Sequence, residues 1–141
     1  MPVGIYNQTI SVVMQYFYIN KDSELPYLRM ELIHDGKYDF MKNNRFNMSI
    51  QNASITFSMW DEDNNLKISE APCDLVLSED SGCEDRYIIQ YRWKKRDTKN
   101  RGQFRGQFKI TFNGGIFQDG EVFPEGDLLM PIYEDLTIMI K

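Results

Sequence analysis

The stretch from Gln103 to Phe112 constrains the fold of this chain more than any other. Small or apolar residues alternate there with polar ones, in the order Gln-Phe-Arg-Gly-Gln-Phe-Lys-Ile-Thr-Phe. Strict alternation is required only of a β-strand that has one buried and one exposed face. The same pattern recurs within residues 53–59, 87–93 and 136–140. Strands of this kind predict a sandwich or barrel that buries one side of each sheet.

Turn-forming residues divide the rest of the chain into short extended segments. Asp61-Glu-Asp-Asn-Asn is predicted to be a hairpin turn, and Gly114-Gly115 a second turn. No segment has a helical pattern, so we predict an all-β sandwich of about eight or nine strands. The predicted strands and extended segments cover residues 13–19, 25–33, 46–50, 53–60, 66–69, 73–77, 86–93, 103–112, 120–123, 129–133 and 135–141.

Length and composition indicate one folded domain with an appended arm. The chain has 141 residues, of which 42% are hydrophobic and 13% aromatic, and this composition excludes general disorder. Residues 1–20 are predicted to form an N-terminal arm and a first strand, and residues 21–141 the sandwich. The apolar run at 10–19 is interrupted by Ser11 and Gln15, so we expect neither a membrane span nor a signal peptide, and synthesis in a cytoplasm.

Charge is distributed unevenly along the chain. The formal net charge is −5, yet residues 86–109 contain nine Lys or Arg and one acid, Asp97. The exposed bases could simply solvate a loop while strand arginines pair with acidic neighbours. Alternatively, they could dock on an acidic protein surface. Nucleic acid is not predicted as a partner, because the acidic remainder would repel phosphate and no recognised reader motif is present. The basic residues of this candidate interface are Lys94, Lys95, Arg96, Lys99 and Arg101.

Three consecutive aromatic residues, Tyr16, Phe17 and Tyr18, form a second candidate interface. At least one of them must face outward from a strand. Such a side chain can anchor a protein partner or stack against a sugar, unless both faces of the sheet are covered there. Ile5 and Tyr6 of the arm are assigned to the same candidate interface.

Catalytic, cofactor and metal sites are not predicted. His34 is the only histidine, so neither a histidine metal triad nor a Ser-His-Asp relay can be assembled. The acidic cluster at 61–65 offers oxygen ligands but is typical of a hairpin turn. Cys73 and Cys83 flank a turn-like segment and are predicted to be free thiols. We therefore do not expect an enzyme.

Several segments, taken in order, resemble a known family. The chain is similar to the immunoglobulin-like N-terminal domain of upper baseplate proteins and related virion proteins of tailed bacteriophages, over residues 20–141. The segments that carry the resemblance are Asp22-Ser-Glu-Leu-Pro-Tyr-Leu-Arg-Met-Glu-Leu, Ala53-Ser-Ile-Thr-Phe-Ser-Met-Trp-Asp, Lys67-Ile-Ser-Glu-Ala-Pro-Cys, Tyr91-Arg-Trp with Asp97-Thr, Gly102-Gln-Phe-Arg-Gly-Gln-Phe-Lys-Ile-Thr-Phe, Phe123-Pro, and Leu136-Thr-Ile-Met-Ile.

The resemblance implies an immunoglobulin-like sandwich that serves as a structural part of a phage particle, in contact with other virion proteins and with copies of itself. Trp93 is expected to fill the core, and Asp97 or Thr98 to cap backbone amides at a corner. Phe123-Pro124 is expected where the chain leaves one sheet for the last strand. Residues 1–20 extend beyond the usual start of such domains. A carbohydrate-binding module for a host surface, using exposed aromatics and acidic loops, is the alternative.

Overall fold

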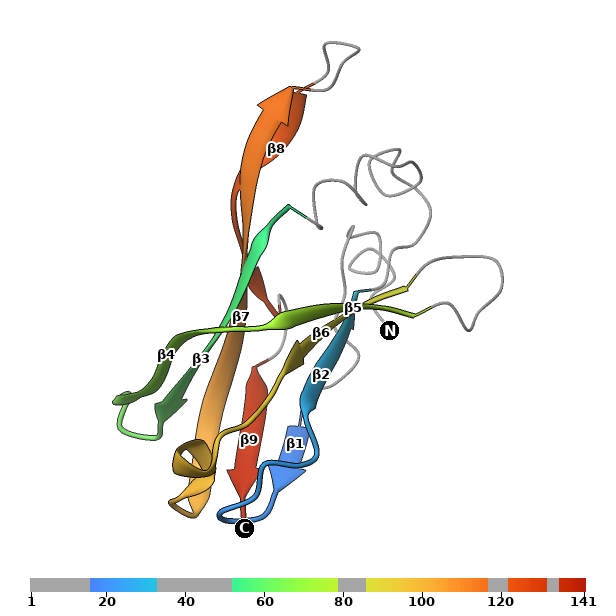
Figure 1. The fold of residues 1–141 in the computed structure, drawn as a ribbon. Coiled ribbons are helices and arrows are strands. Elements are labelled where there is room, and N and C mark those ends of the chain that lie inside the picture. Colours follow the sequence, from blue (N-terminus) through green and yellow to red (C-terminus); the bar gives the residue numbers. More distant parts are fainter. Residues whose placement is uncertain (1–15, 33–51, 79–85, 117–121, 132–134) are drawn as a thin grey trace, which may run out of the picture.

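The chain folds into two β-sheets packed as a sandwich (Figure 1). The computed structural model describes residues 16–32, 52–78, 86–116, 122–131 and 135–141. These residues contain nine strands and one 3₁₀ turn, so the predicted all-β sandwich is confirmed. The elements are β1 (Tyr16–Ile19), β2 (Leu28–Leu32), β3 (Ser54–Asp61), β4 (Leu66–Pro72), β5 (Asp74–Ser78), β6 (Arg86–Tyr91), η2 (Lys95–Thr98), β7 (Gly102–Ile116), β8 (Val122–Met130) and β9 (Leu136–Ile140).

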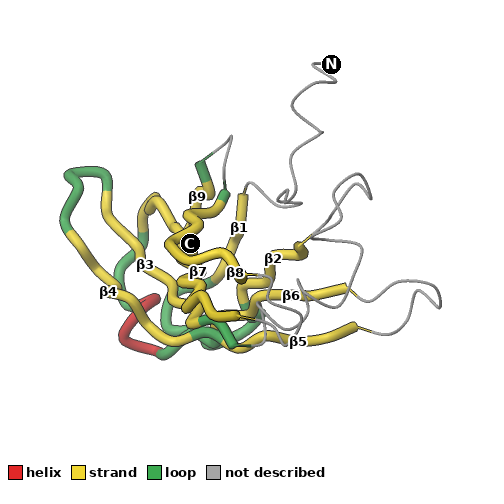
Figure 2. The backbone as a smooth tube through the Cα atoms, turned by 90° about the horizontal axis from the view of Figure 1, so that it is seen from above, coloured by secondary structure: helices red, strands yellow, loops and turns green. Residues whose placement is uncertain are grey.

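The larger sheet has the strand order β1-β9-β7-β3-β4, with β8 also paired to β7. The smaller sheet has the order β2-β6-β5. Strand β7 pairs with β3 along one edge, and with β9 and then β8 along the other. Strands β4 and β5 follow one another along one side of the molecule, yet they belong to different sheets (Figures 1 and 2). The chain therefore changes sheet at Cys73.

An aromatic cluster fills the space between the two sheets. Phe57 on β3 is fully buried, and its ring lies 4.8 Å from that of Tyr91, 5.1 Å from Phe108 and 5.8 Å from Trp93. Trp93 is buried as predicted, and Phe17 stacks on its other side at 5.7 Å. These contacts join three strands of the larger sheet to the end of β6. They give the sandwich a densely packed interior.

Gly106 lies where β7 passes closest to this cluster. A Cβ atom at this position would lie 2.8 Å from Cε1 of Phe57 and 3.3 Å from Cδ2 of Leu136. Any larger residue would therefore overlap the Phe57 ring. The glycine within the alternating stretch is a packing requirement rather than a turn signal.

Strand β7 continues through the predicted turn at Gly114-Gly115, so that prediction is wrong. Asn113 pairs with Glu125 and Gly115 with Phe123, which places Gly114 opposite Pro124. Proline has no N–H to donate to the ladder, and Gly114 adopts a φ of +74° that glycine tolerates. A strand can thus pass these residues without ending.

The segments predicted at 120–123 and 129–133 are not separate. Strand β8 is continuous and pairs with β7 to form a hairpin that extends beyond the sandwich (Figure 1). Phe123-Pro124 therefore lies inside β8 and does not lead directly into the last strand, which begins at Leu136. Proline is usually read as the end of a strand, but β8 pairs on one edge only, and a strand of that kind can contain a proline.

Strand β4 extends to Pro72, beyond the predicted end at residue 69. Its register against β3 shifts twice, and Glu70 adopts a φ of 44° where the strand bulges. β4 is the outer strand of its sheet, where bulges and proline are tolerated. The 3₁₀ turn η2 was also not predicted, because four residues are too few to show a helical period.

Some predicted features lie outside the described residues. They are the arm at 1–12, the strand at 46–50, His34 and Cys83. In the described part of the chain no helix is long and apolar enough to cross a membrane.

Candidate interaction surfaces

The corner that follows β6 is held by the carboxylate of Asp97. Its Oδ2 atom accepts hydrogen bonds from the Tyr91 hydroxyl at 2.5 Å and from the backbone N–H of Lys94 at 2.9 Å. The N–H of Asp97 donates in turn to the carbonyl of Lys94. The prediction that Asp97 caps this corner is confirmed. Burial, and next the bond to Asp97, raise the pKa of the Tyr91 hydroxyl above its ordinary value, so it remains the donor.

Thr98 fastens the corner to the loop between β1 and β2. Its side chain is fully buried, and its hydroxyl donates to the carbonyl of Ser23 at 2.8 Å. The N–H of Asp22 donates to the carbonyl of Thr98. Of the two residues expected to cap amides here, Asp97 does so, and the Thr98 hydroxyl bonds to a carbonyl oxygen. The corner is thus attached to two parts of the fold and has a defined shape.

The five predicted basic residues all lie on this corner and are exposed, and we call them together the basic corner: Lys94, Lys95, Arg96, Lys99 and Arg101. None of them forms an ion pair with another residue that the structure describes. The neighbouring strand cations differ. Arg92 pairs with Asp74 at 2.8 Å, as one of the two interpretations expects of the arginines, and Lys109 pairs with Glu70 at 2.6 Å.

A groove of about 480 Å³ adjoins the basic corner. Arg92 and Lys94 contribute cations to its lining, and Leu25, Tyr27 and Trp93 contribute apolar surface. The indole N–H of Trp93 is buried and has no acceptor among the described residues. Sequence reasoning missed this groove, because it forms between the β1–β2 loop, the end of β4 and the end of β6.

The aromatic triplet on β1 divides between the two sides of the strand. Tyr16 and Tyr18 are 58% and 54% exposed, so the prediction that part of the triplet faces outward is confirmed. Phe17 is only 6% exposed and stacks on Trp93. It belongs to the core, and its assignment to an interface is corrected here. Ile5 and Tyr6 lie outside the described residues.

The outer face of the larger sheet carries a row of side chains across five strands. The strand register places Tyr16 beside Thr137, Thr137 beside Arg105, Arg105 beside Trp60, and Trp60 beside Leu66. The guanidinium carbon of Arg105 lies 4.7 Å from the centre of the Trp60 ring, an arrangement that holds both side chains in place. Sequence reasoning missed the row, because it depends on the order of strands far apart in the chain.

A shallow hollow of about 230 Å³ opens on this face between the β3–β4 turn and β9. Polar side chains from three segments line it, among them Glu62, Asn64, Gln103, Arg105, Asp135 and Thr137. The hollow therefore offers both hydrogen-bond donors and acceptors. No group of three or more His, Cys, Asp or Glu side chains in the described ranges is arranged to hold a metal ion.

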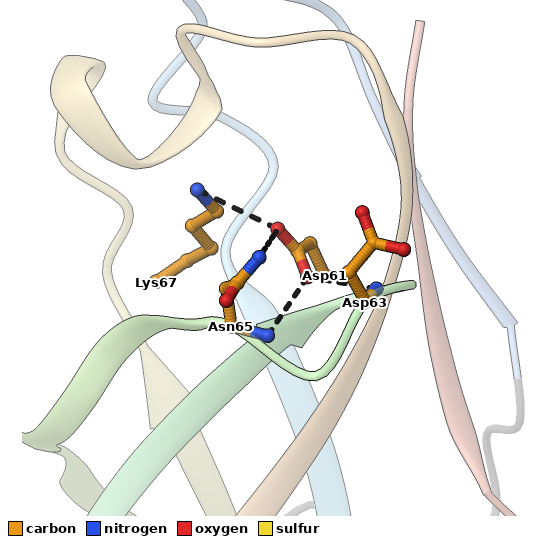
Figure 3. A network of polar contacts seen from close by, with 4 residues as sticks. All are labelled: Asp61, Asp63, Asn65 and Lys67. Atoms are coloured by element: carbon orange, nitrogen blue, oxygen red, sulfur yellow. Dashed lines mark hydrogen bonds and ion pairs between the residues drawn. The ribbon is translucent and has the colours of Figure 1, made fainter.

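The β3–β4 turn forms one wall of the hollow and is organised by Asp61 (Figure 3). One carboxylate oxygen accepts the backbone N–H groups of Asp63 and Asn65, at 2.9 and 2.8 Å. The other accepts the side-chain amide of Asn65 and lies 3.6 Å from the ammonium of Lys67. Asn64 completes the turn with a φ of 65°. The predicted hairpin turn is confirmed, and it accounts for the acidic cluster.

We predict that the pKa of the Asp61 carboxyl lies below its ordinary value of 3.8. The backbone hydrogen bond from Asn65 is the main cause, because it stabilises the charged carboxylate. The folded pKa is depressed, so this contribution to stability is complete above pH 3.8 and is lost as the pH falls through the folded pKa. Carboxyl-detected NMR titration measures the pKa of Asp61 in the folded protein. Asn65→Ala, which removes only the side-chain donor, is expected to raise the pKa part of the way, and a midpoint at or above 3.8 in the unmodified protein would contradict the assignment.

Cys73 is a free thiol, as predicted. It is partly buried at the change of sheet, and its thiol donates to the carbonyl of Ala71 at 3.7 Å. Burial raises the pKa of Cys73 to about 12. The thiol is therefore protonated at neutral pH and has little nucleophilic character.

No model of a protein family matches the chain, and a search of curated proteins finds no match.

Proposed function

We propose that this protein is a non-enzymatic structural component of a tailed phage virion. It would act as an immunoglobulin-like module that docks on a larger assembly at the baseplate, tail, neck or capsid surface. Its partners would be other virion proteins and copies of itself, and it would be located in the virion. The basic corner and the arm at residues 1–12 would form the contacts.

The strand order supports the immunoglobulin-like part of the proposal. In constant-type immunoglobulin domains, strands B, E and D share one sheet, and C, F and G share the other. Here β2, β6 and β5 correspond to the first group, and β3, β7 and β9 to the second. β4 takes the position of the additional strand C′ in variable-type domains. Two features differ from the constant-type arrangement: β1 pairs in parallel with β9, and β8 is an additional strand paired to β7.

One observation carries the docking part of the proposal, namely that five exposed cations sit unpaired on a corner held in shape by hydrogen bonds. A loop that only needs solvation does not require the bonds that Asp97 and Thr98 make. A corner of defined shape loses less conformational entropy when it binds. Its positive potential would attract an acidic protein surface. The adjoining groove would add apolar contact to an interface of about 1,000 Å² or more.

The arm would add a second contact by a different mechanism. An extended segment can lie along the edge of a neighbouring sheet and form backbone hydrogen bonds with it. Pro2, Gly4 and Asn7 punctuate the arm, which favours an extended segment with a role outside the domain.

Neutralising the basic corner tests the proposal. We expect the triple variant Lys94→Gln, Lys95→Gln, Lys99→Gln to fold normally and to reduce the copies per purified particle on the order of tenfold, because electrostatic attraction would be lost. The control is Lys67→Gln with Lys109→Gln, which removes one exposed and one half-buried lysine, both ion-paired, from elsewhere on the domain. Quantitative mass spectrometry of particles measures the copy number. Incorporation of the folded triple variant at the unmodified level would refute this role of the corner.

A further inference from the structure

The outer face of the larger sheet gathers most of the exposed apolar side chains. Among the described residues five large apolar side chains are exposed, and four of them lie on this face: Tyr16, Tyr18, Leu66 and Leu129. Tyr16 and Tyr18 point outward because Phe17 and Ile19 between and beside them are buried. Leu66 is paired with Trp60, and Leu129 with the outward-facing Lys109. Such a concentration on one face indicates an interaction site.

The shape of this face suits a narrow, elongated ligand. Tyr16 and Trp60 are separated by three strand intervals along the row, or roughly 14 Å at the usual strand spacing. The whole row from Tyr16 to Leu66 spans roughly 19 Å across the strands.

Polar groups between the aromatic side chains are available to a ligand. The hollow lies along the middle of the row, where Thr137 and Arg105 separate Tyr16 from Trp60. The side chains of Gln103, Glu62 and Asp135 line it and form no hydrogen bond with other described residues. Asp61 also lines the hollow, but its carboxylate already accepts hydrogen bonds from Asp63 and Asn65 of the turn. Amide, carboxylate, guanidinium and hydroxyl groups therefore meet in a space that can hold one sugar ring.

We propose that this face binds a neutral oligosaccharide. A sugar presents an apolar face that stacks on an aromatic ring, and its hydroxyls both donate and accept hydrogen bonds. Tyr16 and the polar hollow supply these two kinds of contact on the same face, whereas Lys141 lies over the ring of Tyr18 at 4.8 Å and Arg105 over that of Trp60 at 4.7 Å. Asp61, Glu62 and Asp135 outnumber Arg105 around the hollow. The local negative charge disfavours sialylated and uronate-containing chains.

Two features hold the site in shape before a ligand binds. Arg105 is stacked on Trp60, and the turn that carries Glu62 is closed by the bonds to Asp61. The hollow is lined by strands of the larger sheet and by the β3–β4 turn, and no residue of the basic corner lines it. Loss of one surface should therefore leave the other functional.

An array of neutral, sialylated and uronate-containing oligosaccharides, probed with the full-length chain, tests the proposal. We expect binding to neutral chains only, followed by calorimetry with the strongest array ligand. Tyr16→Ala and Gln103→Ala are each expected to weaken that binding on the order of tenfold, since one stacking or hydrogen-bonding contact is lost. Two controls are expected to bind as the unmodified protein does. One is Leu25→Ala, which shortens the exposed apolar side chain that does not lie on this face, and the other is the basic-corner triple variant.

Far-ultraviolet dichroism and a thermal melt establish that each variant is folded. Three results would overturn the proposal: no binding to any neutral oligosaccharide, binding confined to sialylated or uronate chains, or affinity unchanged in both folded variants Tyr16→Ala and Gln103→Ala.

Discussion

Replacing Phe57 with alanine is expected to lower the free energy of unfolding by about 3–5 kcal/mol. The ring is fully buried, and it contacts the rings of Tyr91, Trp93 and Phe108 at the centre of the sandwich. Its removal forfeits apolar burial and leaves a cavity between the two sheets. Domains of this size are stable by about 5–15 kcal/mol in total, so the variant would lose a large part of its stability.

Urea denaturation followed by tryptophan fluorescence measures this loss. Tyr18→Ala is the matched control, because that aromatic side chain is 54% exposed and should change stability by less than about 0.5 kcal/mol. A loss below about 1 kcal/mol for Phe57→Ala would mean that Phe57 does not occupy the centre of the core.

Gly106→Ala is expected to destabilise the protein by about 1–3 kcal/mol, although it adds only one methyl group. The new carbon would lie 2.8 Å from Cε1 and 3.0 Å from Cζ of Phe57, so the ring must move within a packed interior. Gln107→Ala changes the adjacent residue of the same strand and serves as control, with an expected change below about 0.5 kcal/mol.

A double-mutant cycle identifies the cause of the Gly106→Ala effect. Phe57→Leu removes the two ring atoms that the added carbon would meet, so the alanine should cost less in that background. We expect a coupling energy of about 1 kcal/mol or more between the two sites. Additive effects would show that Gly106 is required for a reason other than contact with Phe57.

The alternation of apolar residues predicts the architecture well because it is a local property of each strand. Phe104, Phe108 and Ile110 are all buried on β7, and the polar residues between them face outward. The turn at 61–65 was also predictable, because Asp and Asn close it by bonds within the turn itself. Both features depend on residues close together in the chain.

Features that depend on strand pairing could not be predicted in this way. Gly114-Gly115 has the composition of a turn, but β8 pairs alongside it and the strand continues. Phe17 has an aromatic neighbour on each side, so composition alone does not say which of the three faces inward; in the structure Phe17 shares the buried side of β1 with Ile19 and stacks on Trp93. The row from Tyr16 to Leu66 requires the order of five strands.

The candidate docking surface was predictable in part. Charge along the chain indicated Lys94 to Arg101, because a dense run of cations cannot be buried without partners. The bond that fastens this corner to the rest of the fold involves Ser23, which no local pattern connects to it. Whether the corner was flexible or ordered therefore became evident only from the structure.

A density map of an assembled particle that contains this protein tests the docking proposal most directly. The account predicts that the basic corner, residues 94–101, faces a neighbouring protein and is buried against acidic side chains. A map in which the module is attached to its neighbours while the basic corner projects into solvent would contradict it.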